Sequence, residues 1–235
     1  MDKVIFKQNL RKISQRERMK SMGLTLDKKR KVKWIGNDYG GFAIDDSLLR
    51  NSPVVFSFGI GEDISFDIGL MENYNANIYG FDPTPKSIQW VENNVRNSQF
   101  HFYPYGLGTF NGVEKFYLPE NSDYVSGSII QRSGLKNAYI EVPMKTFDTI
   151  LSDIKPSRID ILKMDIEGSE FKVISDILNS KIMISQICVE VHSSFFENGD
   201  EVLKNFLKEC RNCGYKLIYV SDSLNELTFI HGGSI

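Results

Sequence analysis

The sequence predicts an α/β protein with a mostly parallel β-sheet, helices on both faces and a C-terminal antiparallel hairpin. Between residues 53 and 213, short apolar segments of strand length alternate with longer segments whose apolar residues recur at helical spacing. Strands that alternate with helices form parallel sheets covered on both faces. Near the end of the chain, two apolar strands flank the turn SDSLN, which is typical of a β-hairpin and adds one antiparallel strand.

In the first half of this pattern, an apolar strand over 54–58 ends in a glycine turn, and residues 64–74 show helical apolar spacing. A second strand over 76–81 ends on Asp82. The further elements expected here are a helix over 85–95, a strand over 100–105 followed by the turn Gly106, Leu107 and Gly108, a strand over 113–118, a polar Gly/Ser-rich lid or loop over 121–134, a short strand over 140–142 that pairs with 113–118, and a helix over 147–154.

The second half repeats the alternation and ends in the hairpin. A buried strand ends on Asp165, and the next strand ends near Glu190 and His192. The elements expected in this half are strands over 160–164 and 186–191, helices over 169–178 and 202–213, and hairpin strands over 215–220 and 226–230.

Charge divides the 235 residues into a basic extension over 1–33 and a domain over 34–235. The extension holds twelve Lys or Arg and three acids, whereas the remainder holds sixteen basic and twenty-seven acidic residues. Phe6, Leu10 and Ile13 stand at helical spacing, and 27–33 is typical of a linker. The extension could contact an anionic membrane surface or a polyanionic substrate, or be a solvated helix and linker; nucleic acid is not expected as a partner.

The rest of the composition indicates a cytoplasmic protein. No apolar run approaches the roughly 20 residues that cross a bilayer, and the charged N-terminus has no signal-peptide pattern. The three cysteines are Cys188, Cys210 and Cys213, an odd number that gives no disulfide framework. Cys210 and Cys213 form a lone C-x-x-C, which we interpret as structural thiols rather than half of a zinc site.

The first two strand ends carry the features of an adenosine-type cofactor site. In open α/β sheets, ligands bind outside the carboxyl ends of the strands. Gly59 and Gly61 directly follow Phe58, and glycine there lets the backbone and the next helix N-terminus approach a ligand. Asp82 ends the following strand, where a carboxylate can accept both ribose hydroxyls.

The composition of the glycine turn favours S-adenosylmethionine over NAD. The dinucleotide pattern G-x-G-x-x-G requires a third glycine, but Ile64 stands at that position. Glu62 and Asp63 would repel a pyrophosphate, whereas they suit the cationic amino and sulfonium groups of S-adenosylmethionine.

Asp165, Glu190 and His192 follow two later strands and could converge on an acceptor. His192 is the natural general base, because the unperturbed pKa of imidazole is near neutral pH. Asp165 could orient the donor, polarise His192 or share a divalent metal with Glu190. Glu170, in the first turn of a helix, is explained by the helix dipole alone.

The segments SFGIGED, YGFDPTP, YPYGLG, MKTFDTIL, DILKMDIEGSEF and ICVEVH resemble, in this order, the FkbM-type methyltransferase family, and KMDIEGSE is the most diagnostic. The resemblance implies a class I, Rossmann-like methyltransferase with a seven-stranded sheet. It also implies S-adenosylmethionine as donor, S-adenosylhomocysteine as product, and O-methylation of a sugar, glycan, glycolipid or related natural product. By the family pattern, Gly59 and Gly61 would line the methionine end of the donor, Asp82 the ribose, and Tyr105 with Gly106 the adenine side.

This chain departs from the family at the first motif, which in many members reads D-x-G-A-N-x-G. Ser57 stands at the place of the aspartate, Gly61 at that of the asparagine, and Asp63 at that of the second glycine. We expect Glu62 or Asp63 to contact the donor amino group instead. Two other interpretations stay open: a nicotinamide-dependent oxidoreductase, and a binding module that holds the cofactor without turnover.

Overall fold

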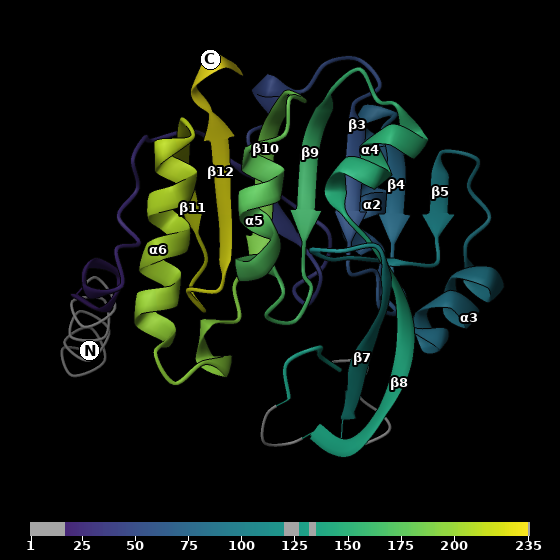
Figure 1. Cartoon of the computed structure of the whole chain (residues 1–235). Helices are drawn as coiled ribbons and strands as arrows, with labels where there is room; N and C mark the ends of the chain where they lie inside the picture. The colour runs from purple at the N-terminus through teal and green to yellow at the C-terminus, as the bar shows by residue number, and fades with distance from the viewer. Residues whose placement is uncertain (1–16, 120–126, 132–134, 235) are drawn as a thin grey trace, which may run out of the picture.

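The computed structural model describes residues 17–119, 127–131 and 135–234, and it confirms the predicted α/β fold. Its main sheet has seven strands in the order β11-β12-β10-β9-β3-β4-β5, and β12 alone runs opposite to the other six (Figure 1). The strands are β3 Val54–Phe58, β4 Asn77–Phe81, β5 Phe100–Tyr103, β9 Ile159–Met164, β10 Ile184–Glu190, β11 Tyr215–Val220 and β12 Glu226–His231.

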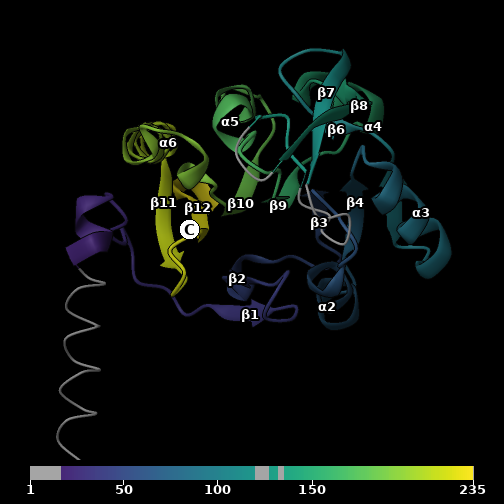
Figure 2. The same ribbon diagram turned by 90° about the horizontal axis from the view of Figure 1, so that it is seen from below.

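Helices cover the two faces of this sheet, as Figure 2 shows. One face carries α4, α5 and α6, and the other carries α2, α3 and the small sheet of β1 and β2. The helices are α2 Ser65–Tyr74, α3 Pro85–Asn94, α4 Phe147–Ile154, α5 Glu170–Leu178 and α6 Gly199–Asn212, and the two short strands are β1 Lys33–Ile35 and β2 Phe42–Ile44. Two apolar clusters, one on each face, form the core of the molecule.

A three-stranded sheet of β6, β8 and β7 corrects one expectation and extends another. Gly106 and Leu107 were expected in a turn, but they form β6 Gly106–Leu107, parallel to β8 Leu135–Lys145. The expected pairing of 113–118 with 140–142 is confirmed within a longer ladder between β7 Gly112–Pro119 and β8. Figure 1 shows β7 and β8 reaching beyond the edge where the parallel strands end.

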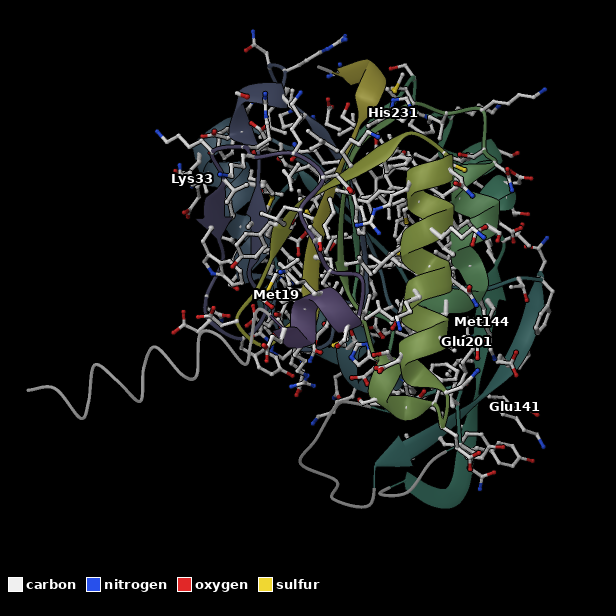
Figure 3. All side chains as sticks on the ribbon, turned by 90° about the vertical axis from the view of Figure 1, so that its left-hand side faces the viewer. Met19, Lys33, Glu141, Met144, Glu201 and His231 are labelled. Atoms are coloured by element: carbon white, nitrogen blue, oxygen red, sulfur yellow. The ribbon has the colours of Figure 1, made fainter. Side chains whose placement is uncertain are left out.

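The described part of the N-terminal segment packs on α6. A short helix over 17–21 is followed by Met22 and Leu24, both buried in the same apolar cluster as Leu207. Figure 3 shows this segment beside α6, with Met19 labelled. Asp27 pairs with Arg211 at 3.0 Å and accepts a hydrogen bond from the backbone of Leu217. The boundary between residues 33 and 34 stays a prediction, and the expected helix around Phe6, Leu10 and Ile13 lies outside the described residues.

The described residues contain no helix that is both long and apolar enough to cross a membrane.

Candidate functional site

A cleft opens where the carboxyl ends of β3, β4 and β9 meet, at the edge that the sequence indicated. Most of the predicted cofactor-binding residues line it: Phe58, Gly59, Gly61, Glu62, Asp63, Asp82, Gly106 and Asp165. Tyr105 is not among the lining residues, because its buried ring packs on Phe81 and lies under the Lys145 ammonium group. Whether these residues bind a donor stays a prediction, but the structure brings all of them except Tyr105 to one cleft.

Gly59 and Gly61 have different tasks in the turn between β3 and α2. Both have positive φ angles, of 81° and 56°. A Cβ on Gly59 would lie 1.7 Å from the backbone oxygen of Asp165, whereas a Cβ on Gly61 would meet no atom within 4 Å. Gly59 therefore lets β3 and β9 end side by side, and Gly61 leaves the cleft open.

The Asp82 carboxylate organises this turn. One of its oxygens accepts hydrogen bonds from the backbone N–H groups of Ile60, at 3.1 Å, and Gly61, at 2.9 Å. The other accepts hydrogen bonds from the backbone and side chain of Thr84. Asp82 is therefore buried at the cleft wall with both oxygens in use, and it fixes the shape of the glycine turn.

The two acids of the turn, Glu62 and Asp63, each have another partner. Glu62 is half-exposed and forms an ion pair with Lys86 at 3.1 Å. Asp63 accepts hydrogen bonds from the backbone of Ser65, at the start of α2, and from the side-chain amide of Asn37. Partial burial alone would raise the pKa of Asp63, but these hydrogen bonds outweigh it and lower the pKa below its ordinary value.

Sequence reasoning missed a polar group under the cleft floor, formed by Ser57, Asp67 and Lys163. Ser57 and Lys163 are neighbours on β3 and β9, and all three residues are buried. The Lys163 ammonium donates to the backbone oxygen of Gly59 at 2.5 Å, while Oδ1 of Asp67 has no hydrogen-bond partner within the described part of the chain. The signal in the sequence is an acid on the core face of α2, next to Phe66 and one turn before Leu70 and Met71.

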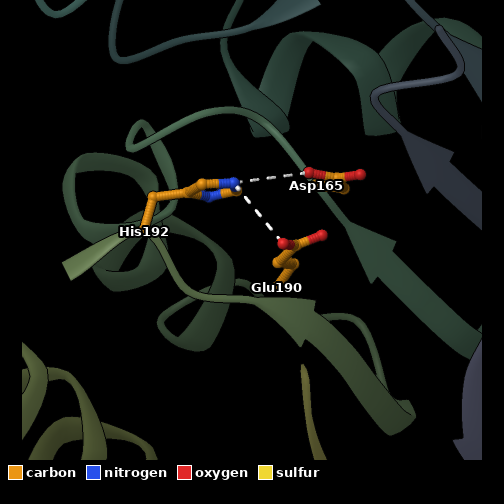
Figure 4. Close-up of side chains that lie close together, drawn as sticks. All are labelled: Asp165, Glu190 and His192. Atoms are coloured by element: carbon orange, nitrogen blue, oxygen red, sulfur yellow. Dashed lines mark ion pairs between the residues drawn. The ribbon is translucent and has the colours of Figure 1, made fainter. Parts of the chain in front are cut away.

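Beyond the Asp165 end of the cleft, His192 lies among four carboxylates, three of them close to its Nε2 atom. Nε2 is 3.8 Å from Asp165, 3.7 Å from Glu167 and 3.8 Å from Glu190. Figure 4 shows the ring edge facing both Asp165 and Glu190. The structure thus brings together the three residues predicted to act on the acceptor, although Glu190 and His192 do not line the donor cleft itself.

Glu170 fixes the histidine, which corrects the view that it serves only the helix dipole. Its side chain is fully buried and accepts hydrogen bonds from the backbone N–H groups of His192, at 2.7 Å, and Gly168, at 2.9 Å. The same carboxylate lies 3.2 Å from Nδ1 of His192. It therefore sets both the backbone position and the ring orientation of His192.

The acidic surroundings change the protonation of this cluster. Burial alone would lower the pKa of His192, but Glu170, Glu167 and Asp165 raise it to about 9. Burial, together with the nearby charge of Asp165, raises the pKa of Glu190 to about 7. At neutral pH, His192 is therefore largely an imidazolium, and Glu190 can bind or release a proton.

Asp165, Glu190 and His192 could also hold a divalent cation. One ligand atom of each lies within 4.8 Å of the others. The His192 ring also has its second nitrogen against Glu170, an arrangement that orients many metal-binding histidines. A cation and the proton on His192 would compete for Nε2.

Part of the segment predicted as a lid contacts the strand-end turn. Gly127 and Ile129 line the cleft, and Ser128 donates to the backbone oxygen of Glu167 at 2.6 Å. Residues 120–126 and 132–134 lie outside the described residues, so closure of the predicted lid stays a prediction.

Comparisons with known proteins agree with this fold. Residues 55–217 match the methyltransferase FkbM domain, as the motif order predicted. No curated protein matches the chain. Among solved structures, the chain resembles a fibrillarin in complex with Nop5p at 12% identity, a TM-score of 0.50, and coverage of 78% of this chain and 74% of that one.

Two further solved structures are also similar to the chain. One is the fibrillarin pre-rRNA processing protein of Methanococcus jannaschii, with 10% identity, a TM-score of 0.49 and coverage of 79% and 68%. The other is Aeropyrum pernix fibrillarin with natively bound S-adenosyl-L-methionine, with 11% identity, a TM-score of 0.44 and coverage of 77% and 66%. At these identities a likeness concerns the fold alone, and the match to the fibrillarin in complex with Nop5p, with its TM-score of 0.50, is the one on which the predicted class I methyltransferase fold rests here.

Proposed function

Because the chain belongs to the FkbM methyltransferase family, we propose that it transfers a methyl group from S-adenosylmethionine to a hydroxyl oxygen of a sugar, glycan or related natural product. The observation that carries this proposal is that Asp165 belongs both to the donor cleft and to the cluster around His192. It lines the cleft beside the glycine turn, and it lies 3.8 Å from the imidazole of His192. A donor in the cleft and a hydroxyl at the histidine would therefore meet at Asp165.

The cluster supplies the proton chemistry that O-methylation needs. S-adenosylmethionine, when bound, supplies the electrophilic methyl group. The oxygen–carbon bond forms as the carbon–sulfur bond breaks, and the hydroxyl proton passes to the cluster. His192 accepts it when its Nε2 is unprotonated, and Asp165 and Glu190 stabilise the resulting imidazolium. S-adenosylhomocysteine is the second product.

The donor part of the proposal is tested by ligand-dependent thermal stability. We expect S-adenosylhomocysteine to raise the Tm of the wild-type protein, and NAD to leave it unchanged. Asp82→Ala should abolish the shift, because it frees the N–H groups of Ile60 and Gly61 and deforms the turn. Glu92→Ala, which removes an exposed acid from α3, should keep it. Stabilisation by NAD alone would overturn the proposal.

The acceptor part needs a product measurement. The protein is incubated with S-adenosylmethionine and candidate glycans, glycolipids or free sugars, and the products are analysed by mass spectrometry for one added methyl group. Base-stable methylation of a hydroxyl supports the proposal. Methyl transfer only to amines or carboxylates would contradict O-methylation of a hydroxyl while leaving the donor assignment intact.

We also propose that the basic segment over 1–33 contacts an anionic surface such as a phospholipid membrane, which could bring the enzyme to a lipid-linked acceptor. The support is the excess of basic residues in this segment. Arg30 pairs with Asp45 and Lys33 contacts Tyr74, so the proposal rests on the other basic side chains of the segment. Sedimentation with anionic vesicles, but not with neutral ones, is the expected result, and equal sedimentation with both would contradict it.

A further inference from the structure

We propose that Asp67 binds the α-ammonium group of the donor's methionine moiety and so replaces the first-motif aspartate that this chain lacks. This inference rests on the proposed use of S-adenosylmethionine, but it does not depend on the acceptor. It assigns the contact to a residue of α2, a full helical turn beyond the two acids that the sequence suggested.

The position of Asp67 is that of a ligand-binding group rather than a surface acid. It is 2% exposed, and it lines the cleft together with Gly59, Gly61 and Lys163. Its Oδ1 atom and the Ser57 hydroxyl both lack a hydrogen bond of normal geometry within the described part of the chain, although Ser57 lies near enough to lower the pKa of Asp67. A buried carboxylate oxygen without a partner is costly, so a donor group arriving in the cleft would remove an existing penalty.

The other acids around the turn already have partners. Asp82 uses both oxygens for the turn and for Thr84. Asp63 uses one oxygen for Ser65 and the other for Asn37, and Glu62 is paired with Lys86. Asp165 also lines the cleft, but its carboxylate faces the His192 ring, whereas Asp67 is a fully buried carboxylate with an unpartnered oxygen within the described part of the chain.

The nearby ammonium group of Lys163 does not form an ion pair with Asp67. The Lys163 ammonium lies close enough to favour the ionised carboxylate, yet it donates to the backbone oxygen of Gly59 and forms no ion pair with Asp67 within 4.0 Å. Burial prevails over this attraction and raises the pKa of Asp67 to about 6. A ligand ammonium group would supply the missing counter-charge and hold Asp67 in its ionised form.

The wild-type protein provides the first test, because it avoids any effect of mutation on folding. Calorimetry compares S-adenosylhomocysteine with an analogue that lacks only the α-amino group. We expect the analogue to bind on the order of 10- to 100-fold more weakly, as is typical for the loss of a charge-assisted hydrogen bond. Equal affinities would overturn the inference. If the protein binds neither S-adenosylmethionine nor S-adenosylhomocysteine, the proposed function fails as well.

The second test uses the near-isosteric variant Asp67→Asn. S-adenosylmethionine and S-adenosylhomocysteine should lose affinity by similar factors, and the amino and deamino ligands should now bind alike. 5′-Methylthioadenosine, which has no amino-acid part, should bind the variant and the wild type equally. Glu72→Gln, which neutralises an exposed acid on the same helix, should leave all affinities unchanged.

Two results with this variant would contradict the assignment. Equal weakening of all three ligands, methylthioadenosine included, would show that Asp67 only shapes the cleft. A loss confined to S-adenosylmethionine would place the carboxylate at the sulfonium, since S-adenosylhomocysteine lacks that charge.

Discussion

The pKa of His192 is set by side chains that come from separate elements of the fold. Glu170 begins α5, Glu190 ends β10, and Asp165 follows β9, yet all three lie within 4 Å of the same ring. Each carboxylate favours the imidazolium form, so His192 carries a proton on both ring nitrogens at neutral pH. A hydroxyl acceptor therefore meets an unprotonated histidine only in the minority of molecules that have released this proton.

This charge state predicts an alkaline rise in activity. In the wild type, kcat/KM should increase with pH, reach half of its maximum near pH 9 and level off about one pH unit higher, because His192 is the proton acceptor only when neutral. His192→Ala should abolish turnover while S-adenosylhomocysteine still binds, and Asp165→Asn should abolish turnover as well. Initial rates between pH 6 and 10 check this, and a near-native rate for His192→Ala would place the base elsewhere.

Glu170→Gln separates the charge of Glu170 from its packing. The amide keeps an acceptor for the backbone of His192 but removes a negative charge from Nδ1, so the pKa of His192 falls. The rising limb of the pH–rate profile should move to lower pH by about one unit or more, since a close carboxylate shifts a pKa by 1 to 3 units. A purely structural Glu170 would lower the rate at every pH without moving the limb.

At the scale of elements, the glycine turn between β3 and α2 contains two glycines with opposite sensitivities. Gly59→Ala places a methyl group against the backbone of Asp165 in addition to the positive-φ cost, so we expect it to lose at least about 3 kcal/mol of stability. Gly61→Ala has room for its methyl group and should lose only about 1 to 2 kcal/mol.

The two glycine variants should also be compared by their affinity for S-adenosylhomocysteine. The methyl group of Gly61→Ala stands at the cleft, so this variant should fold while binding S-adenosylhomocysteine more weakly than the wild type. Urea unfolding and calorimetry measure the two effects. Equal loss of stability in both variants would contradict the division of tasks between the two glycines.

Elements whose signals are local could be predicted from the sequence, whereas those that depend on distant pairing could not. The spans predicted for β3 and α4 match the structure residue for residue, because apolar period and flanking residues define them. Gly106 and Leu107 were predicted to form a turn with Gly108, because two residues followed by a second glycine show no strand pattern. Only Met144 and Lys145 of β8, far along the chain, make them a strand.

The residues of the candidate site likewise fall into those that the sequence predicts and those that it does not. Asp82, Asp165 and His192 lie at or just after the ends of strands. They could be predicted as site residues because ligands bind at the carboxyl ends of parallel strands. Asp67 comes from inside a helix and reaches the cleft because α2 packs on one face of the main sheet, and Glu170 meets His192 across 22 residues of chain. The local pattern marks Asp67 only by its place on the apolar face of α2, and it does not distinguish Glu170 from a solvated acid in the first turn of a helix.

At the scale of the whole molecule, the buried titratable groups predict how stability depends on pH. The pKa of His192 is raised to about 9, that of Glu190 to about 7 and that of Asp67 to about 6. All three shifts are upward, so the folded state binds more protons than the unfolded state between about pH 4 and 9. The free energy of unfolding should therefore fall as pH rises through this range, by up to about 1.4 kcal/mol per pH unit for each titrating group.

The share of His192 can be isolated above pH 7.5, where Glu190 and Asp67 are mostly ionised. Its stabilising contribution is complete below the unfolded pKa of about 6.5 and is lost as pH rises through about 9. The buried thiol of Cys188, whose pKa burial raises to about 12, adds a decline of the same sign near pH 9 in wild type and variant alike. Urea unfolding at intervals between pH 7.5 and 9 should therefore give a shallower decline for His192→Gln than for the wild type. Parallel curves would mean that the carboxylates around the ring do not hold a proton on His192 in the folded protein.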